Sequence, residues 1–69
     1  MNVEWVDGFT IKTEAIDGEF VISANKEGML SLAKQLTALA EGEKGDHIHY
    51  DENNSLEDGS CELILERAE

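Results

Sequence analysis

The residues of this chain best suited to chemistry are two histidines and the acids around them. His47 and His49 lie two apart where polar and apolar residues alternate, so on a strand their side chains would share one face. Asp51 would extend this row to a third residue that can bind a metal ion. A structural zinc site needs a fourth ligand, and Cys61 is predicted to point to the opposite face. We therefore expect no metal site and no cofactor.

No group of residues completes a catalytic site. Cys61 alternates with Leu63 and Leu65, which predicts a buried thiol, and no nearby cation would activate it. The carboxylates could supply an acid and a base, but a chain of 69 residues has little volume for a concave pocket. The sequence therefore favours a binding protein over an enzyme.

Acidic side chains dominate the second half of the chain. The formal net charge is −11, and residues 41–69 hold ten acids against two bases, net −8. This cluster has two readings that stay open: a surface that keeps a small protein in solution, or a surface for a basic partner. The bases are too scattered to form a patch, so neither nucleic acid nor an anionic membrane is expected as a direct partner.

The predicted partner-binding surface combines the histidine pair with the neighbouring acids. Its residues are Asp46, His47, His49, Asp51, Glu52, Glu57, Asp58 and Glu62.

Length and composition indicate one small domain over residues 1–69, expected in the cytoplasm. A single cysteine cannot form an intramolecular disulfide, and the first twenty residues are acidic where a signal peptide would need a basic start. No apolar stretch approaches the roughly 20 residues that span a bilayer. Because the core must be small, a homodimer would add to its stability.

The turn signals predict an α+β fold. Asp-Gly pairs at residues 7–8, 17–18 and 58–59 mark turns next to β-rich stretches. Strands are predicted over 9–16, 19–24, 47–50 and 60–67, with a further short candidate at 1–6. Asn25 can cap a helix that Gly42 ends. We predict two layers: an antiparallel sheet of about four strands, covered on one face by the helix, in the order ββαββ.

Periodicity assigns the faces. Gly28, near the start of the helix, predicts a close approach to another backbone. Gln35 is expected to point away from the sheet, while the apolar helix residues face it: Met29, Leu32, Ala33, Leu36, Leu39 and Ala40. Strand residues expected to face the helix are Phe9, Ile11, Thr13, Ala15, Phe20, Ile22, Ile48, Tyr50, Cys61, Leu63 and Leu65. Trp5 is predicted to pack in the core. The strand order stays open.

Three segments together resemble one known family. Asn25–Ala33, His47–Asp51 and Asn54–Glu66 are similar to the pattern of immunity protein 32 from bacterial polymorphic toxin systems. The resemblance runs from about residue 24 to 66 and leaves residues 1–16 uncovered. It implies a small α+β protein that binds and neutralises a toxin domain inside the cell, and it carries over no catalytic residue. Many such toxins are nucleases, whose basic substrate groove carboxylates could occlude.

Our leading interpretation is therefore a toxin-neutralising protein that binds its cognate toxin through the acidic surface. One alternative is a self-associating structural or regulatory module, for which Val21 and Ile64 on the open sheet face are candidates. Another is a metal or pH sensor that uses His47, His49 and Asp51. The sequence does not identify the toxin.

Overall fold

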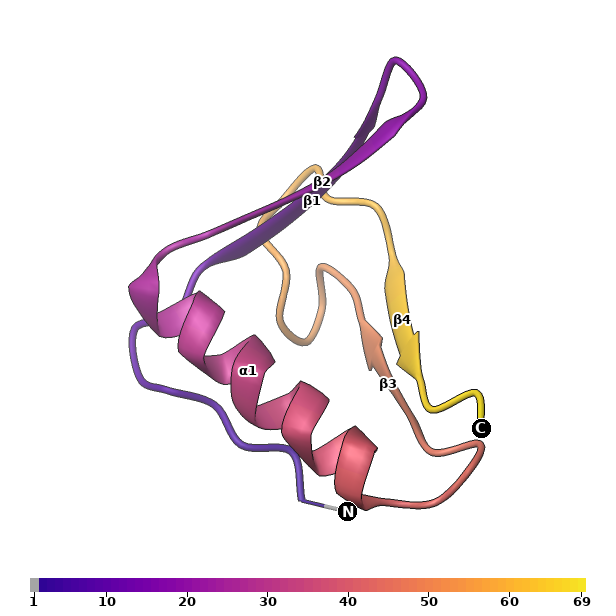
Figure 1. The fold of residues 1–69 in the computed structure, drawn as a ribbon. Coiled ribbons are helices and arrows are strands. Elements are labelled where there is room, and N and C mark those ends of the chain that lie inside the picture. The colour runs from indigo at the N-terminus through magenta and orange to yellow at the C-terminus, as the bar shows by residue number, and fades with distance from the viewer. Residues whose placement is uncertain (1) are drawn as a thin grey trace.

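The computed structural model describes residues 2–69, and its elements follow the predicted order (Figure 1). The elements are β1 (Ile11–Ile16), β2 (Glu19–Ala24), α1 (Lys26–Glu41), β3 (His47–Tyr50) and β4 (Leu63–Glu66). The α+β class and the ββαββ order are confirmed. Within the described residues, β1 pairs with β2 and β3 pairs with β4, so the strands form two small sheets and not the single sheet that we predicted.

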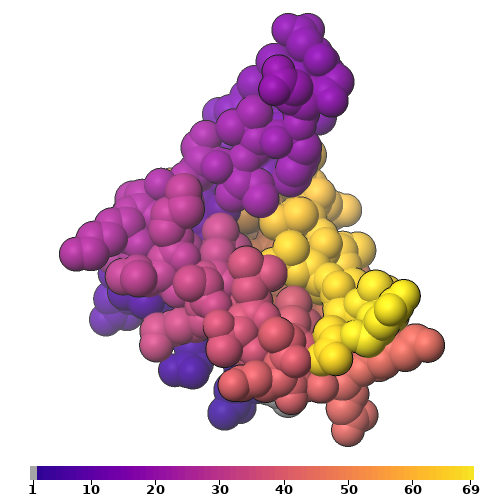
Figure 2. Space-filling model, viewed as in Figure 1, coloured from indigo at the N-terminus to yellow at the C-terminus, as the bar shows by residue number. Residues whose placement is uncertain are grey.

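β1 and β2 form a hairpin that projects from the rest of the molecule (Figures 1 and 2). Its register runs from Ile11 opposite Ala24 to Ile16 opposite Glu19. The predicted Asp-Gly turn lies at its tip, where residue 17 has φ 48° and residue 18 has φ 82°. Positive φ at both positions matches the twist of antiparallel strands, so this turn fixes the register of the hairpin.

The segment that precedes β4 lies along the outer edge of β1. The carbonyl oxygen of Ile11 accepts from the N–H of Glu57 at 2.9 Å, and that of Thr13 accepts from the N–H of Cys61 at 3.1 Å. The Ser60 hydroxyl oxygen accepts from the N–H of Thr13 at 3.1 Å. These bonds cover the outer edge of the first half of β1 and join it to the segment that leads into β4.

Local signals set both ends of α1, as predicted. The side-chain oxygen of Asn25 accepts from the N–H of Gly28 at 2.7 Å and from that of Thr10 at 3.0 Å, so it caps the helix and fixes the chain before β1. A Cβ added at Gly28 would lie 2.5 Å from the carbonyl oxygen of Thr10, which confirms the predicted close approach. Gly42 ends the helix by donating its backbone N–H to the carbonyl oxygen of Leu39 at 3.2 Å.

The buried face of α1 differs from the apolar face that we predicted. The helix residues that are buried are Gly28, Ser31, Gln35 and Leu39, whereas Met29 and Leu36 are more than half exposed. The prediction for Gln35 is therefore wrong, and among the predicted apolar contacts Leu39 is buried and Leu32 partly so.

The irregular N-terminal segment explains why the buried face of α1 is polar. Residues 2–6 form no strand, so the candidate strand at 1–6 is absent over the described residues, and their polar groups need other partners. The Ser31 hydroxyl accepts from the N–H of Val6 at 2.8 Å, and the Gln35 side-chain NH₂ donates to the carbonyl of Glu4 at 2.8 Å. The helix therefore buries side chains that hydrogen-bond this segment.

Gln35 also joins the helix to β3. Its side-chain oxygen accepts from the hydroxyl of Tyr50, which is buried. Burial raises the pKa of Tyr50 to about 12. The two hydrogen bonds of Gln35, one with Tyr50 and one with Glu4, thus connect β3, α1 and the N-terminal segment.

The apolar core is small and lies between α1, the start of β1, β3 and the segment before β4. Its buried members are Ile11, Leu39, Ile48, Tyr50 and Leu56. The ring of Trp5 stacks on Phe9 with centroids 4.4 Å apart and meets Tyr50 edge-on at 6.0 Å. The predicted packing role of Trp5 is confirmed.

Four expectations about the strands are wrong. The strand predicted from residue 9 begins at Ile11, and the one predicted over 60–67 shortens to Leu63–Glu66. Cys61 is exposed, because residues 57–61 follow the edge of β1 in an irregular path before β4 starts. Ala15, Phe20 and Ile22 were expected to face the helix but are exposed. The helix starts directly after β2 and runs away from the hairpin tip, so it cannot cover them (Figure 1).

Candidate protein-interaction surface

The outer face of the β3–β4 pair carries the two histidines. The register places His47 opposite Glu66 and His49 opposite Ile64, and all four are exposed. The imidazole centroids are 5.1 Å apart, which confirms that the two rings share a face. The Nδ1 atom of His47 lies 2.9 Å from the carbonyl oxygen of Gly45. This face is an open surface that offers two rings, one apolar side chain and one carboxylate.

Asp51 does not extend the histidine row into a metal-binding group. Residues 2–69 contain no set of three or more His, Cys, Asp or Glu side chains placed to hold a metal ion. One carboxylate oxygen of Asp51 accepts from the N–H of Asn53 at 2.9 Å and from that of Asn54 at 3.0 Å. This carboxylate therefore shapes the turn that follows β3.

Glu52 has a similar structural contact. Its carboxylate accepts from the N–H of Gly59 at 2.7 Å and so closes the loop between β3 and β4. Two of the predicted partner-binding acids, Asp51 and Glu52, thus hold the loop in shape.

Like Glu52, the loop acids Glu57, Asp58 and Glu62 are exposed. They stand on a fixed support, because Leu56 before them is buried in the core and the backbone of residues 57–61 bonds to β1. A preformed acidic surface loses less entropy on binding than a mobile one.

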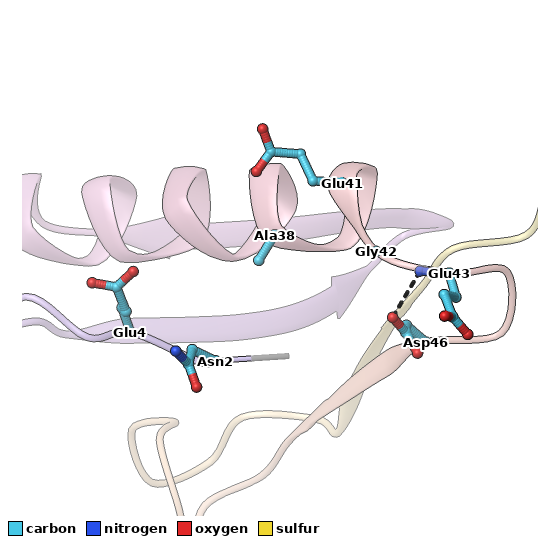
Figure 3. Close-up of a pocket in the computed structure, with 7 residues that line it drawn as sticks. All are labelled: Asn2, Glu4, Ala38, Glu41, Gly42, Glu43 and Asp46. Carbon is cyan, nitrogen blue, oxygen red and sulfur yellow. Dashed lines mark hydrogen bonds between the residues drawn. The ribbon is translucent and has the colours of Figure 1, made fainter.

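A second acidic region lies at the end of α1 (Figure 3). It is a hollow of about 540 Å³ lined by Asn2, Glu4, Ala38, Glu41, Gly42, Glu43 and Asp46. One carboxylate oxygen of Asp46 accepts from the N–H of Glu43 at 2.9 Å, which orders the turn below the helix. Four of the seven lining residues are acidic, so the hollow would favour a lysine or arginine side chain over an acidic one.

Few bases offset these acids. Arg67 donates to the carbonyl oxygen atoms of Leu39 at 3.3 Å, Ala40 at 2.8 Å and Gly42 at 3.3 Å, so its charge stabilises the end of α1. Among the described residues the one ion pair joins Lys12 and Glu14 at 3.6 Å, in the hairpin. None of the described acids in residues 41–69 therefore forms a salt bridge.

β3 separates the predicted site into two places. Asp46 precedes the strand and lies in the hollow, while the loop acids follow the strand, about 16 Å farther along an extended chain. The residues that sequence reasoning missed are Glu4, Glu41 and Glu43, which also line the hollow. Two of these lie in the acidic half of the sequence, but nothing near Glu4 indicated that it would join them.

A known protein family matches most of this chain. The family model described as Immunity protein 32 matches residues 19–68 of the 69-residue chain. The chain belongs to this immunity-protein family. No curated protein and no solved structure matches it.

The part that matches the Immunity protein 32 family extends from β2 to the end of β4. It includes the histidine face, the loop acids and Asp46. Glu4 and β1 lie outside the match, so one wall of the hollow comes from residues that the family pattern does not describe. Within residues 2–69, no helix is both long and apolar enough to cross a membrane.

Proposed function

We propose that this protein binds a cognate toxin domain of a polymorphic toxin system in the bacterial cytoplasm and neutralises it by occupying its active surface. Membership of the Immunity protein 32 family implies a toxin partner. The observation that carries the proposal further is the acidic surface of residues 41–69, where no described acid forms a salt bridge. An unpaired acidic surface favours a basic partner, and the groove of a nuclease is basic because it binds phosphates.

The two acidic regions have different roles in this proposal. Glu57, Asp58 and Glu62 steer the toxin and form the rim of the interface, together with His47 and His49. Asp51 and Glu52 contribute negative charge but act mainly by holding the loop in its binding shape.

The hollow that contains Asp46 receives a lysine or arginine of the toxin. Binding alone achieves inhibition in this scheme, so no catalytic residue and no cofactor is needed.

The experiment that tests this function starts from the gene next to the one that encodes this chain. A toxin domain from that neighbour should arrest growth when expressed alone, and growth should recover when this chain is expressed with it. The purified pair should associate with a rate that falls as salt rises from about 0.05 M to about 0.5 M, because salt screens the attraction between opposite charges. A toxic neighbour that this chain neither binds nor neutralises would contradict the proposal.

A further inference from the structure

The outer half of the β1–β2 hairpin exposes apolar side chains that nothing in the described chain covers. Ile16 is 45% exposed, Phe20 49%, Val21 40% and Ile22 37%. Three of them belong to β2, which carries a single charge, Glu19. Apolar side chains grouped on one projecting element are uncommon on a monomer and mark an interaction surface.

β2 also presents an unpaired backbone edge. The two-residue turn makes Ile16 and Glu19 a hydrogen-bonded pair, and such pairs alternate along an antiparallel ladder. By this alternation, the N–H and C=O groups of Phe20 and Ile22 point away from β1. Within residues 2–69, β1 is the only strand that pairs with β2. An exposed apolar edge of this kind is a template for another strand.

The accessible surface of the molecule is larger than expected for a compact monomer, as it would be if part of it were covered by a partner. Its accessible surface is 4748 Å², whereas a compact monomer of this mass is expected to have about 4,300 Å². The excess is about 450 Å² per copy. A dimer that buried this area on both copies would bury about 900 Å² in total, close to the ~1,000 Å² at which specific interfaces begin.

We propose that two copies of this protein pair through β2, in antiparallel orientation, to form a continuous four-stranded sheet of two hairpins. The two-fold axis passes at Val21, which places Phe20 opposite Ile22 of the second copy and Glu19 opposite Ser23. The outward backbone groups of Phe20 and Ile22 then bond each other across the axis. Like-charged residues do not face each other in this register.

Neighbouring registers fit the chain less well. An axis at Phe20 would shorten the ladder and place Glu19 opposite Val21. An axis at Ile22 would bring the second copy against the end of β2, where Asn25 turns the chain into α1. The axis at Val21 therefore joins the longest stretch of free edge away from the helix.

The charge distribution also favours the hairpin as the place where two copies meet. Residues 11–24 hold three acids and one base, net −2, whereas residues 41–69 carry net −8. The strongly acidic parts therefore stay outside the interface, but the total of −11 on each copy still causes repulsion. Dimerisation should strengthen with added salt, which is opposite to the salt dependence of toxin binding, so the two inferences can fail separately.

Analytical ultracentrifugation over micromolar concentrations tests the dimer. The wild type should dimerise, more tightly at about 0.5 M than at about 0.05 M salt. Val21→Lys should weaken the dimer roughly tenfold or more, because like charges then meet at the axis. The variant should still fold, since position 21 faces Glu14 within its own hairpin. Leu36→Lys, on the exposed side of α1, is the matched control and should leave the dimer unchanged.

Cysteine cross-linking tests the register. In a Cys61→Ser background, Val21→Cys should give an oxidised dimer, since residues opposite each other in a non-hydrogen-bonded pair have Cα atoms about 4.5 Å apart. Glu19→Cys should not, because the two equivalent positions would lie about 13 Å apart along the strands. A monomer at every concentration and salt, a dimer insensitive to Val21→Lys, or equal cross-linking at both positions would overturn the proposal.

Discussion

The irregular loop of residues 51–61 packs against the rest of the molecule, whereas the outer half of the longest regular hairpin does not. Residues 51–61 form no strand or helix, yet their side chains and backbone bond to one another and to β1, and Leu56 is buried. The β1–β2 hairpin has regular pairing over six residues per strand but leaves Phe20 and Ile22 exposed. Regular secondary structure satisfies the backbone, but only contact with a second layer buries side chains.

The two regions therefore offer surfaces of opposite chemistry. The body of the molecule, meaning the described residues outside the β1–β2 hairpin, displays carboxylates on a loop held by hydrogen bonds, and charge gives its partner a fast and salt-sensitive approach. The hairpin displays apolar side chains and a free edge, which favour a partner that adds a strand. Variants that disturb one region should leave the other intact.

The largest expected effect is on the body, at Gln35. Gln35→Leu should lower the free energy of unfolding by about 2–4 kcal/mol, because the hydroxyl of Tyr50 and the carbonyl of Glu4 would each lose a buried partner. Urea denaturation measures the loss. The adjacent and exposed Leu36→Ala is the control, with an expected cost below about 1 kcal/mol. Equal losses at the two positions would show that the polar network does not hold the body together.

The second prediction concerns the pH dependence of the same network. Burial raises the pKa of Tyr50 to about 12, so the folded protein retains a proton that the unfolded chain loses near pH 10. The contribution of Tyr50 to stability should be constant below about pH 10 and should fall by about 2–3 kcal/mol between about pH 10 and 12. Tyr50→Phe should lack this fall, and the difference between the two proteins isolates Tyr50 from the lysines. Parallel curves would contradict the prediction.

The third prediction concerns the exposed loop acids in toxin binding. Neutralising Glu57, Asp58 and Glu62 by Gln, Asn and Gln should slow association about tenfold at low salt, because these acids steer the toxin. The carboxylates that shape the loop are left in place, so folding is preserved.

A variant with the same charge change elsewhere provides the control: Asp7→Asn, Glu14→Gln and Glu27→Gln together. It should slow association less, and both variants should approach the wild-type rate at high salt. If the two slow association equally, total charge and not its location determines the rate.

The smallest expected effect is on the hairpin. Phe20→Ala should cost less than about 1 kcal/mol in dilute monomer, although a buried phenylalanine costs about 3–5 kcal/mol, because this ring has no covering layer. Ile48→Ala, in the core of the body, should cost about 2–4 kcal/mol. Urea denaturation at low protein concentration measures both. A large loss at Phe20 would mean that the hairpin packs in solution against something that this structure does not show.

Signals between near neighbours were read correctly from the sequence. The Asp17-Gly18 turn set the first hairpin, Asn25 and Gly42 set the helix, and alternation placed His47 and His49 on one face. Each signal depends on a few adjacent residues, so it keeps its meaning in any tertiary context. The family resemblance had the same origin, because its motifs are contiguous segments, and the match over residues 19–68 confirmed it.

The sequence did not predict which neighbour packs against each face of an element. The helix was expected to cover a four-stranded sheet with its apolar face, but it packs against the irregular N-terminal segment with Ser31 and Gln35. Cys61 was expected inside and is exposed. Periodicity shows that an element has two faces, but it cannot tell which neighbour each face meets when that neighbour needs hydrogen bonds.

The sequence by itself determined the order of elements, the hairpin turn, the helix ends, the excess of acid in residues 41–69 and the family, since all of these are properties of contiguous residues. Only the tertiary structure decided that the sheet is divided in two and that Glu4 lines a hollow with Asp46. It also decided that Asp51 and Glu52 shape a loop while Glu57 and Asp58 stay free. These features depend on contacts between residues far apart in the chain, whose free energies are small and are settled by the packing of the whole molecule.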